Sequence, residues 1–387
     1  MKDFIITSLQ PWDIEIGSTI KNTALEIARQ NRVLFVNPPQ TLMQWLHTLF
    51  QKKGKREPET WVSPRLLVVR CRYPALPVAS MPWKWLFRAM NYCNNLLIAA
   101  TLERTMKKHR FHNVIHLMDT DIFRSRYLKQ LLHPALSIYY RRDYVIGVDY
   151  WKKYGPECER QLARQSDIVI TNSSNFTEEL KPLNPHTYTT NTGVNLQLYD
   201  AGQPHDQPAD MEGIPLPVIG YTGVLTGQRL DADLLLEIAR RMPQCSFVFV
   251  GPEDDYFARH ALHRLPNTYF MGRKPVSELP AYIRHFTVCI NPQKLNPITD
   301  GNYPLKVDEY LAMGKPVVAT STHTMRDVFA AHTHLASSAD EWTAALERAI
   351  REAGNRELEE QRIAFARTHS WAHSVEKIYE IIETLKP

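Results

Sequence analysis

Short apolar runs and amphipathic stretches alternate along most of the chain. Phe4–Thr7 and Val33–Val36 are apolar runs of strand length, and between them Ser18 can cap an amphipathic helix from Thr19 to Arg29. This order of strand, loop, helix and strand is typical of a parallel sheet covered by helices. The same pattern predicts further strands at Asn113–His116, Ser137–Tyr140, Ile168–Thr171, Thr187–Thr190, Val218–Thr222, Phe247–Val250, Thr268–Phe270, Cys289–Asn291 and Val317–Thr320. It predicts further helices near Phe123–Leu131, Asp231–Arg241, Ser277–Arg284, Asp340–Ala353 and Trp371–Leu385. Two more are expected, one from a cap at Ser173 and Ser174 to Leu180, and one from Pro304 that ends at Gly314.

The alternation forms two series, which predicts an α/β protein of two Rossmann-like domains with parallel sheets. Residues 201–217 are rich in Pro, Gly and Asp and have little to bury, so we interpret them as an interdomain linker. The expected organisation is an N-terminal domain of residues 1–200 and a C-terminal domain of residues 218–370. A last helix at residues 371–387 would return to the N-terminal domain. Two such sheets would hold a ligand in a central cleft between their carboxyl ends.

The segment between Thr41 and Arg110 has a different character, because large aromatic side chains are mixed with basic ones. MQWLHTLFQKKGKR and MPWKWLFRAMNYCNNLLIAATLERTMKKHR both predict amphipathic helices with basic faces. The aromatic and basic residues are Trp45, Trp83, Trp85, Phe87, Lys52, Lys53, Lys55, Arg56, Lys84 and Arg88. In one interpretation the aromatic residues are core and the basic residues form a solvated face. In the other, the helices contact an anionic membrane surface.

Composition narrows the class of protein. The 387 residues carry a net charge of +5, which tolerates an anionic partner but gives no reason to expect nucleic acid. The five cysteines are scattered without a CxxC pair, which favours reduced thiols in the cytoplasm and offers no zinc spacing. The N-terminus does not resemble a signal peptide, and the longest apolar run is far shorter than the ~20 residues that span a bilayer. We expect a cytoplasmic protein, soluble or peripheral on the inner face of the membrane.

The stretch from Cys289 to Thr320 predicts a strand, a loop, a short helix that begins near Pro304, and a second strand. A loop that enters a helix N-terminus after a parallel strand is a ready anion site. Lys306 adds a positive charge at that site, and Glu309 lies three residues later on the same helical face. Because a carboxylate suits ribose hydroxyls and a cation suits phosphates, the pair fits a nucleoside diphosphate. It could equally be an ordinary surface ion pair.

Other residues follow predicted strands at the same sheet edge. Gly223 and Arg229 lie in the loop after Val218–Thr222, where glycine allows close approach of phosphate and arginine can bind it. Gly272 and Arg273 follow Thr268–Phe270, although such residues also make ordinary turns. In the first half the polar candidates near strand ends are Asp13, Glu15, His116, Asp119, Asp121 and Asp143. No GxSxG, HExxH or metal-ligand cluster is present in the sequence.

Several segments together resemble retaining glycosyltransferases of the GT-B fold, in particular the large family four. IGYTGVL, FVFVG, LPNTYFMG, ELPAYI and PLKVDEYLAMGKPVVAT occur in the family's order and approximate spacing. DIVITNSSNFTEEL…TNTGVN resembles the end of the family's N-terminal domain. The N-terminal half is similar only coarsely, with a likeness to transferases of the teichuronic-acid and capsule type.

The resemblance implies a GT-B fold, with a UDP- or GDP-linked sugar bound by the C-terminal domain and an acceptor bound by the N-terminal domain. It implies that Glu309 holds the ribose, that Lys306 and Arg229 contact the diphosphate, and that the turn with Gly272 and Arg273 forms the base pocket. The family's first motif glutamate falls at Gly301, so donor-sugar contacts are expected from Asp300, Gly301 and Asn302. Acceptor-side candidates are Asp13, Glu15, Gly17, Asp119 and Asp143.

The implied catalysis is stabilisation of the leaving diphosphate by Arg229 and Lys306, with no bound metal or other cofactor. An inverting enzyme would need a base, for which His116, Asp119 and Asp143 are the candidates. The leading hypothesis is a hexosyltransferase-like enzyme that transfers sugar to a glycan or lipid-linked acceptor in cell-surface polysaccharide biosynthesis. A nucleotide-sugar epimerase and a catalytically silent nucleotide-sugar-binding protein are the alternatives.

Overall fold

The computed structural model describes residues 1–14, 18–50 and 57–385. It divides into two compact units, each with its own sheet and cores. Residues from Met1 to Thr190 form the first unit together with the C-terminal residues from Val375, and Asn191–Ser374 form the second. Glu15, Gly17 and the predicted basic residues Lys52, Lys53, Lys55 and Arg56 lie outside the described residues.

The first unit is built on an eight-stranded sheet with the order β3-β4-β2-β1-β5-β6-β7-β8. Every neighbouring pair is parallel except β3 and β4. The strands are β1 (Asp3–Ser8), β2 (Arg32–Asn37), β3 (Glu59–Ser63), β4 (Leu66–Arg70), β5 (Ile115–Asp119), β6 (Leu136–Arg141), β7 (Ile168–Thr171) and β8 (Thr187–Thr189). The central strands are buried on both faces, as expected of a parallel sheet covered by helices.

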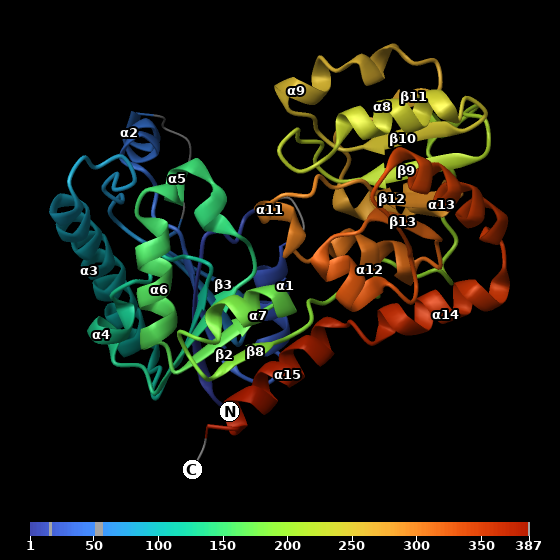
Figure 1. The fold of residues 1–387 in the computed structure, drawn as a ribbon. Helices are drawn as coiled ribbons and strands as arrows, with labels where there is room; N and C mark the ends of the chain where they lie inside the picture. The colour runs from blue at the N-terminus through green and yellow to red at the C-terminus, as the bar shows by residue number, and fades with distance from the viewer. Residues whose placement is uncertain (15–17, 51–56, 386–387) are drawn as a thin grey trace. The chain divides into compact units, whose positions relative to one another are not determined.

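Helices cover both faces of this sheet (Figure 1). They are α1 (Thr19–Ile27), α2 (Leu42–Phe50), α3 (Lys84–His109), α4 (Leu128–Leu132), α5 (Asp149–Lys152), α6 (Gly155–Gln165), α7 (Ser174–Leu180) and the last helix, α15 (Trp371–Glu383). On one face, α1 and the part of α15 from Val375 pack on alternate strand residues such as Phe4 and Phe35. On the other face, α3, α4 and α6 cover residues such as Leu34 and Tyr139.

The second unit has a six-stranded, wholly parallel sheet with the order β11-β10-β9-β12-β13-β14. Its strands are β9 (Val218–Thr222), β10 (Ser246–Val250), β11 (Thr268–Phe270), β12 (Val288–Asn291), β13 (Val317–Thr320) and β14 (His334–Ala336). The chain builds outward from β9 in one direction through β11, and then continues on the other side of β9 from β12. The strand order therefore reverses between β9 and β12, and ligands of such sheets bind where this reversal occurs, beyond the carboxyl ends of the strands.

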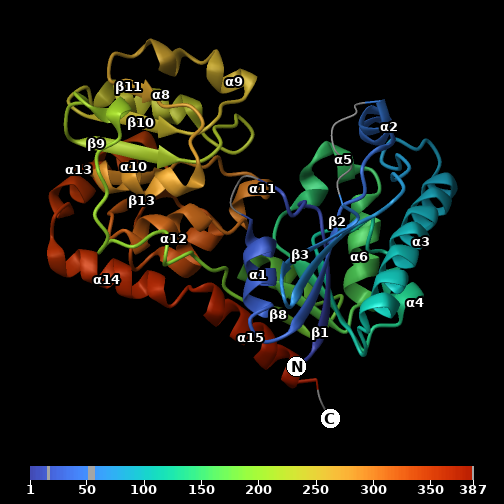
Figure 2. The ribbon, with the colours of Figure 1, turned by 180° about the vertical axis from the view of Figure 1, so that it is seen from behind.

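The helices of the second unit form layers on its two sheet faces (Figure 2). They are α8 (Ala232–Arg241), α9 (Asp255–Ala258), α10 (Leu279–His285), α11 (Pro297–Asp300), α12 (Leu305–Ala312), α13 (Ala339–Glu352) and α14 (Arg356–Arg367). One core joins the sheet to α8 and α13, with Trp342 almost completely buried in it. The other core joins the opposite face to α10, α12 and α14 through residues such as Tyr310 and Ala366.

The structure corrects the predicted linker. Residues 201–217 belong to the second unit, which begins at Asn191. Met211 is 2% exposed in the core of that unit, and the Asp210 carboxylate accepts hydrogen bonds from Lys274 Nζ at 2.6 Å and from Tyr282 Oη at 2.7 Å. A Pro- and Gly-rich composition indicated irregular backbone correctly, but irregular backbone can still pack on a core.

Other differences are local. The segment after Thr41 contains the hairpin of β3 and β4 as well as α2 and α3, because Leu66–Arg70 pairs with β2 as an inner strand. The helix predicted near Phe123–Leu131 is confined to α4, since residues from Asp121 form successive turns instead. The helices α6 and α14 were not predicted. α14 is polar over most of its surface, so its apolar period is weak.

Candidate functional site

The carboxyl ends of β9 and β12 define a candidate binding site in the second unit. β9 and β12 are hydrogen-bonded neighbours, although more than sixty residues separate them in the chain. The loop after β9 contains Gly223, and α12 begins after the loops that follow β12. The Tyr310 hydroxyl of α12 accepts a hydrogen bond at 2.8 Å from the backbone N–H of Thr222, the last residue of β9. This bond fixes the start of the glycine loop against α12.

Lys306 lies directly against the glycine loop. Its Nζ donates a hydrogen bond to the Tyr221 hydroxyl at 3.0 Å and lies 4.6 Å from the centre of the Tyr221 ring. A Cβ placed on Gly223 would lie 3.1 Å from Lys306 Cε and 3.2 Å from Nζ. Gly223 has a φ of +133°, so both its conformation and its surroundings favour glycine. The fold thus brings together two predicted phosphate-binding residues that are far apart in the sequence.

Gly251 is a further component of this site that the sequence reasoning missed. It follows β10 as Gly223 follows β9, and a Cβ at Gly251 would lie only 1.9 Å from the Gly223 carbonyl oxygen. Gly223 N–H in turn donates to the Val250 carbonyl at 2.9 Å. The two loops are therefore in backbone-to-backbone contact. The available signal was the glycine at the end of FVFVG, which repeats the position of the glycine after the preceding strand.

Glu309 lies one turn after Lys306 in a half-buried position on α12. Its enclosure raises the pKa of Glu309 to about 7, and the Asp308 carboxylate adds to the rise. The Lys306 ammonium and the Tyr199 hydroxyl act in the opposite direction, because both stabilise the ionised form. Glu309 thus changes charge near neutral pH. Tyr199, which is 3% exposed, is, like Gly251, a residue near the candidate site that the sequence did not identify.

The raised pKa gives a pH prediction for nucleotide binding. Below about pH 7 the folded protein holds Glu309 mostly neutral, and above it the carboxylate can accept hydrogen bonds from both hydroxyls of a ribose. We expect the affinity for UDP-glucose, measured by calorimetry, to increase between about pH 6 and about pH 8. UDP-glucose is used and not UDP, because the diphosphate of the sugar ester does not titrate in this range. The Glu309→Gln variant should lose that increase, and an identical pH profile for variant and wild type would contradict the assignment.

The raised pKa of Glu309 also affects the stability of the fold, with a pH dependence opposite to that of nucleotide binding. Since the pKa of Glu309 is higher in the folded protein than its ordinary value of 4.5, its contribution to the free energy of unfolding falls as pH rises towards about 7.

A network of buried polar side chains holds α12 in place. The Asp308 carboxylate accepts from the Tyr303 hydroxyl at 2.7 Å and lies 2.7 Å from His369 Nδ1, and all three side chains are at most 5% exposed. Burial raises the pKa of Asp308, and the contacts with His369 and Tyr303 act against the rise. The network holds the helix that carries Lys306 and Glu309 in one rotation, which positions both candidate side chains.

The remaining predicted donor residues are placed around this centre. Arg229 is half-buried in the loop after β9, and its carbonyl accepts a hydrogen bond from the Lys294 N–H at 2.9 Å. Lys294 Nζ donates to the Gly227 carbonyl at 2.8 Å, so the loop after β12 supplies a cation beside the glycine loop that was not predicted. Asp300 ends α11 and accepts from the backbone N–H of His323 at 2.8 Å, while Gly301 caps α11 and Asn302 follows it.

Gly272 and Arg273 form the turn after β11, the edge strand beyond β10, and both are exposed. Gly272 has a φ of +64° with open space around its Cβ position. This turn and the loop of Gly251 follow neighbouring strands. The expected role of the turn with Gly272 and Arg273 as the base pocket stays a prediction.

The structure corrects the prediction that His116 is catalytic. His116 is 0% exposed, its Nε2 lies 3.0 Å from the Thr7 hydroxyl, and burial lowers its pKa to about 3. The predicted strand ended at His116, but β5 runs from Ile115 to Asp119, so His116 is the second residue of a central strand that is buried along its whole length. A fully enclosed, neutral imidazole cannot reach an acceptor, so His116 is a core residue.

Asp119 is also internal. It is 0% exposed, ion-paired with Arg142, and accepts a hydrogen bond from the Ser8 hydroxyl at 2.7 Å. Asp119 therefore ties the ends of β1, β5 and β6 together, and this burial argues against direct acceptor contact. Asp13 lies 3.6 Å from Arg70 and remains accessible, and Asp143 is half-buried. These two stay acceptor-side predictions.

The chain is similar to known proteins in sequence and in fold. Residues 216–353 match the family model described as glycosyl transferases group 1. TuaH of Bacillus subtilis (strain 168), named as a candidate teichuronic acid biosynthesis glycosyltransferase, is 27% identical over 232 residues. That match covers 58% of this chain and 58% of the relative's own length.

Solved structures match over the whole chain. Sucrose-phosphate synthase from Thermosynechococcus elongatus has a TM-score of 0.71 at 15% identity, with 100% of this chain and 99% of that chain covered. An α,α-trehalose-phosphate synthase (UDP-forming) from Burkholderia vietnamiensis has a TM-score of 0.71 at 12% identity, with 100% and 98% covered. HepE of Anabaena in complex with UDP has a TM-score of 0.68 at 15% identity, with both chains fully covered. The chain has the GT-B fold, and the resemblance to glycosyltransferases, the EC 2.4 class of transferases, is confirmed.

Within residues 1–14, 18–50 and 57–385, no helix has the length and apolar character needed to cross a membrane. Across the same part of the chain, no three His, Cys, Asp or Glu side chains are grouped as metal ligands.

Proposed function

We propose that this protein is a glycosyltransferase that transfers a sugar from a nucleoside-diphosphate donor to a cell-surface glycan or its lipid-linked intermediate. The observation that carries the proposal is the contact of Lys306 with Gly223 at the reversal of strand order, with Glu309 one turn further along α12. Glycine loop, cation and carboxylate match the phosphates and ribose of one ligand. Uracil is the proposed base, because HepE was solved with UDP and with UDP-glucose.

In the proposed mechanism, the second unit acts on the leaving group. Cleavage of the bond between the sugar and the diphosphate places negative charge on the diphosphate oxygens. Lys306, Arg229 and the N-terminus of α12 would stabilise that charge more strongly in the transition state than in the bound donor. In the retaining reaction that we propose, the leaving phosphate accepts the proton of the acceptor hydroxyl. This assignment requires no side-chain base, consistent with the burial of His116 and Asp119.

Product analysis with a panel of UDP- and GDP-sugars, with and without acceptor, tests the proposed activity. A transferase should release nucleoside diphosphate and form a new glycoside only with acceptor, apart from slow donor hydrolysis. Interconversion of donor sugars without acceptor would identify an epimerase. Donor binding without any turnover would identify a silent binding protein. The anomeric configuration of the product, measured by NMR, tests retention.

Activity is expected to survive chelation of divalent metals. Lys306, Arg229 and backbone N–H groups can meet the charge of the diphosphate without a cation bridge. Turnover in EDTA should therefore equal turnover in buffer within about twofold, a difference too small to represent loss of a catalytic group. Complete loss in EDTA, restored by Mg²⁺ or Mn²⁺, would contradict the proposal.

The proposed place of the reaction is the inner face of the cytoplasmic membrane. A lipid-linked acceptor would be presented there, and the basic, aromatic segment between Thr41 and Arg110 is the part of the chain suited to such a surface.

A further inference from the structure

The outer face of α3 lies on the surface of the first unit and carries large exposed apolar side chains. Along the first half of the helix, the exposed residues include Trp85, Tyr92 and Leu96, with 66%, 43% and 40% of their surfaces accessible. These positions follow helical spacing and form one stripe. Beside them, Trp83 is 59% exposed and stacks on Trp85, with ring centres 6.0 Å apart. The tryptophans predicted as core in one interpretation are therefore at the surface, whereas Phe87 is buried.

The inner face of the same helix is unusually polar. Asn91, Asn94 and Asn95 are at most 3% exposed. Asn91 and Asn95 both donate to the Phe123 carbonyl, at 2.9 and 3.0 Å. Asn94 exchanges two hydrogen bonds with the backbone of Leu76, at 2.8 and 2.9 Å. Rotating α3 to bury the aromatic stripe would break these buried bonds, so the packing of the unit holds the apolar side chains outward.

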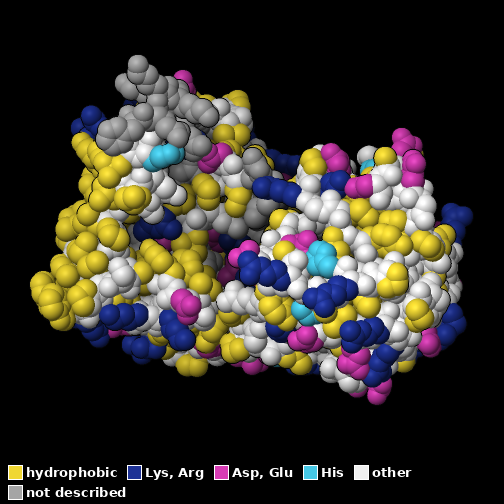
Figure 3. All heavy atoms as spheres, turned by 90° about the horizontal axis from the view of Figure 1, so that it is seen from above, with side chains coloured by type: hydrophobic (Ala, Val, Ile, Leu, Met, Phe, Trp, Pro, Cys, Tyr) yellow, Lys and Arg dark blue, Asp and Glu magenta, His cyan; other side chains and the backbone are white. Residues whose placement is uncertain are grey.

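The apolar surface extends from α3 to α2. Thr41, which precedes α2, pairs with Ala75, and the next residue, Leu76, is bonded to α3 through Asn94. Leu42 and Met43 at the start of α2 are 43% and 76% exposed. Figure 3 shows hydrophobic side chains gathered at the end of the first unit that carries α2 and α3, with Lys and Arg along one border. Contiguous apolar surface of this kind marks an interaction site.

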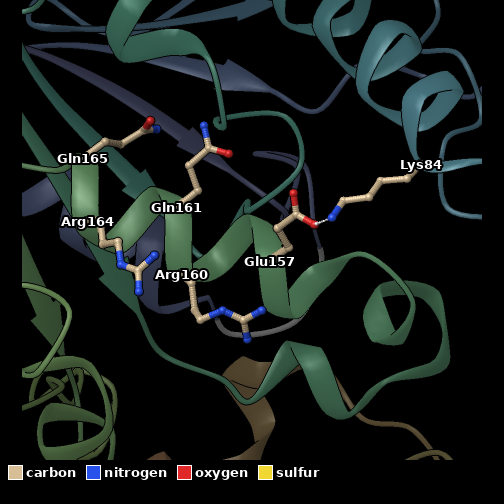
Figure 4. A pocket seen from close by; sticks show the side chains of 6 residues that line it. All are labelled: Lys84, Glu157, Arg160, Gln161, Arg164 and Gln165. Atoms are coloured by element: carbon tan, nitrogen blue, oxygen red, sulfur yellow. Dashed lines mark ion pairs between the residues drawn. The ribbon is translucent and has the colours of Figure 1, made fainter.

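Positive charge flanks the stripe. A surface cavity of about 550 Å³ lies between the start of α3 and α6, and its cationic lining residues are Lys84, Arg160 and Arg164. Lys84 and Arg88 both contact the single acidic lining residue, Glu157, at 2.6 Å. Figure 4 shows Lys84 approaching Glu157 from α3, while Arg160 and Arg164 project from successive turns of α6. The cations therefore outnumber the carboxylate at this border.

The segment of residues 41–110, which contains α2 and α3, also carries an excess of positive charge. Residues 41–110 contain thirteen Lys and Arg, three Glu and no Asp, a net charge of +10. The entire chain carries +5, so the other residues together carry −5. Two copies of such a surface would repel each other, which disfavours a second copy of this chain as the covering partner.

We infer that this surface, formed by α2, the start of α3 and the neighbouring face of α6, docks on an anionic lipid bilayer. Tryptophan and tyrosine are suited to the headgroup level, where one side of the ring meets acyl chains and the other meets water. Lys84, Arg160 and Arg164 would face anionic headgroups, each cation close to the membrane strengthening binding about fivefold. The apolar stripe adds a contribution that salt does not screen.

Vesicle flotation tests the inference and does not depend on donor binding or turnover. The full chain should float with vesicles of phosphatidylcholine mixed with phosphatidylglycerol at low salt, and much less with phosphatidylcholine alone or at high salt. Trp85→Ser and Leu96→Gln should each reduce the partition coefficient about tenfold. Arg160→Gln combined with Arg164→Gln should reduce it at low salt only.

Leu25→Gln is the matched control for Leu96→Gln, because Leu25 is also 40% exposed on a helix of the first unit. It should bind vesicles as the wild type does, and thermal unfolding of every variant should show that each is folded. Failure of the wild type to float on anionic vesicles would overturn the inference. So would equal losses for Leu25→Gln and Leu96→Gln, or dimerisation measured by light scattering that Trp85→Ser abolishes.

Discussion

Replacing Lys306 by alanine should reduce turnover about 10²- to 10³-fold and weaken UDP binding. The ammonium group lies against Gly223, at the place where a diphosphate would meet the loop after β9. A charge-assisted contact with the phosphates contributes about 1.5–3 kcal/mol to binding. Because charge on the diphosphate increases as the glycosidic bond breaks, the loss in kcat should add to the loss in affinity. Steady-state kinetics and calorimetry with UDP measure the two effects separately.

Arg240→Ala is the control for this variant, because it also removes one positive charge from the second unit but lies exposed on α8. It should leave both kinetics and affinity unchanged. If Lys306→Ala weakened binding without lowering kcat, the residue would contribute equally to the ground state and the transition state. Unchanged affinity and turnover together would refute the proposed donor site.

Replacing Gly251 by alanine should weaken nucleotide binding while leaving the first unit folded. The added Cβ would lie 1.9 Å from the Gly223 carbonyl oxygen, and neither partner is a side chain that could move to another rotamer. The two loops must separate, which displaces Gly223 from Lys306 and should lower the free energy of unfolding of the second unit by about 1–3 kcal/mol. UDP affinity should fall at least about tenfold, which corresponds to ~1.4 kcal/mol.

Gly213→Ala is the control for this variant. It introduces alanine into a left-handed backbone conformation without disturbing the contact between the two loops. Gly213 has a φ of +77° but open space around its Cβ position, so the substitution costs about 1–2 kcal/mol without affecting the loops. Its UDP affinity should match that of the wild type. Equal affinities for Gly251→Ala and Gly213→Ala would show that the contact of the two loops does not shape the nucleotide site.

The sequence by itself determined most strands of the two sheets and the class of fold, because the period of apolar residues is a local property. The strand Val218–Thr222 appears where its pattern predicts it, and the helix predicted from Thr19 to Arg29 appears as Thr19–Ile27. The sequence also identified Lys306 and Glu309 as candidates, since a loop that enters a helix after a strand is visible as Pro304 and its neighbours. Patterns failed where polarity was atypical, as in α14, and where an irregular segment was buried, as around Met211.

Only the tertiary structure decided which side chains meet. Pairing of β9 with β12 brings Gly223 to Lys306, and pairing of β9 with β10 brings Gly251 to Gly223, because sheet order is set by contacts between distant residues. Burial likewise decided the role of His116, which the sequence placed at the end of a strand but which is the second residue of the buried strand β5. The orientation of α3 depends on carbonyl groups near Leu76 and Phe123 that its three buried asparagines can reach. A helical period alone leaves both faces of such a helix open, so only the packed fold places its asparagines inside and its tryptophans outside.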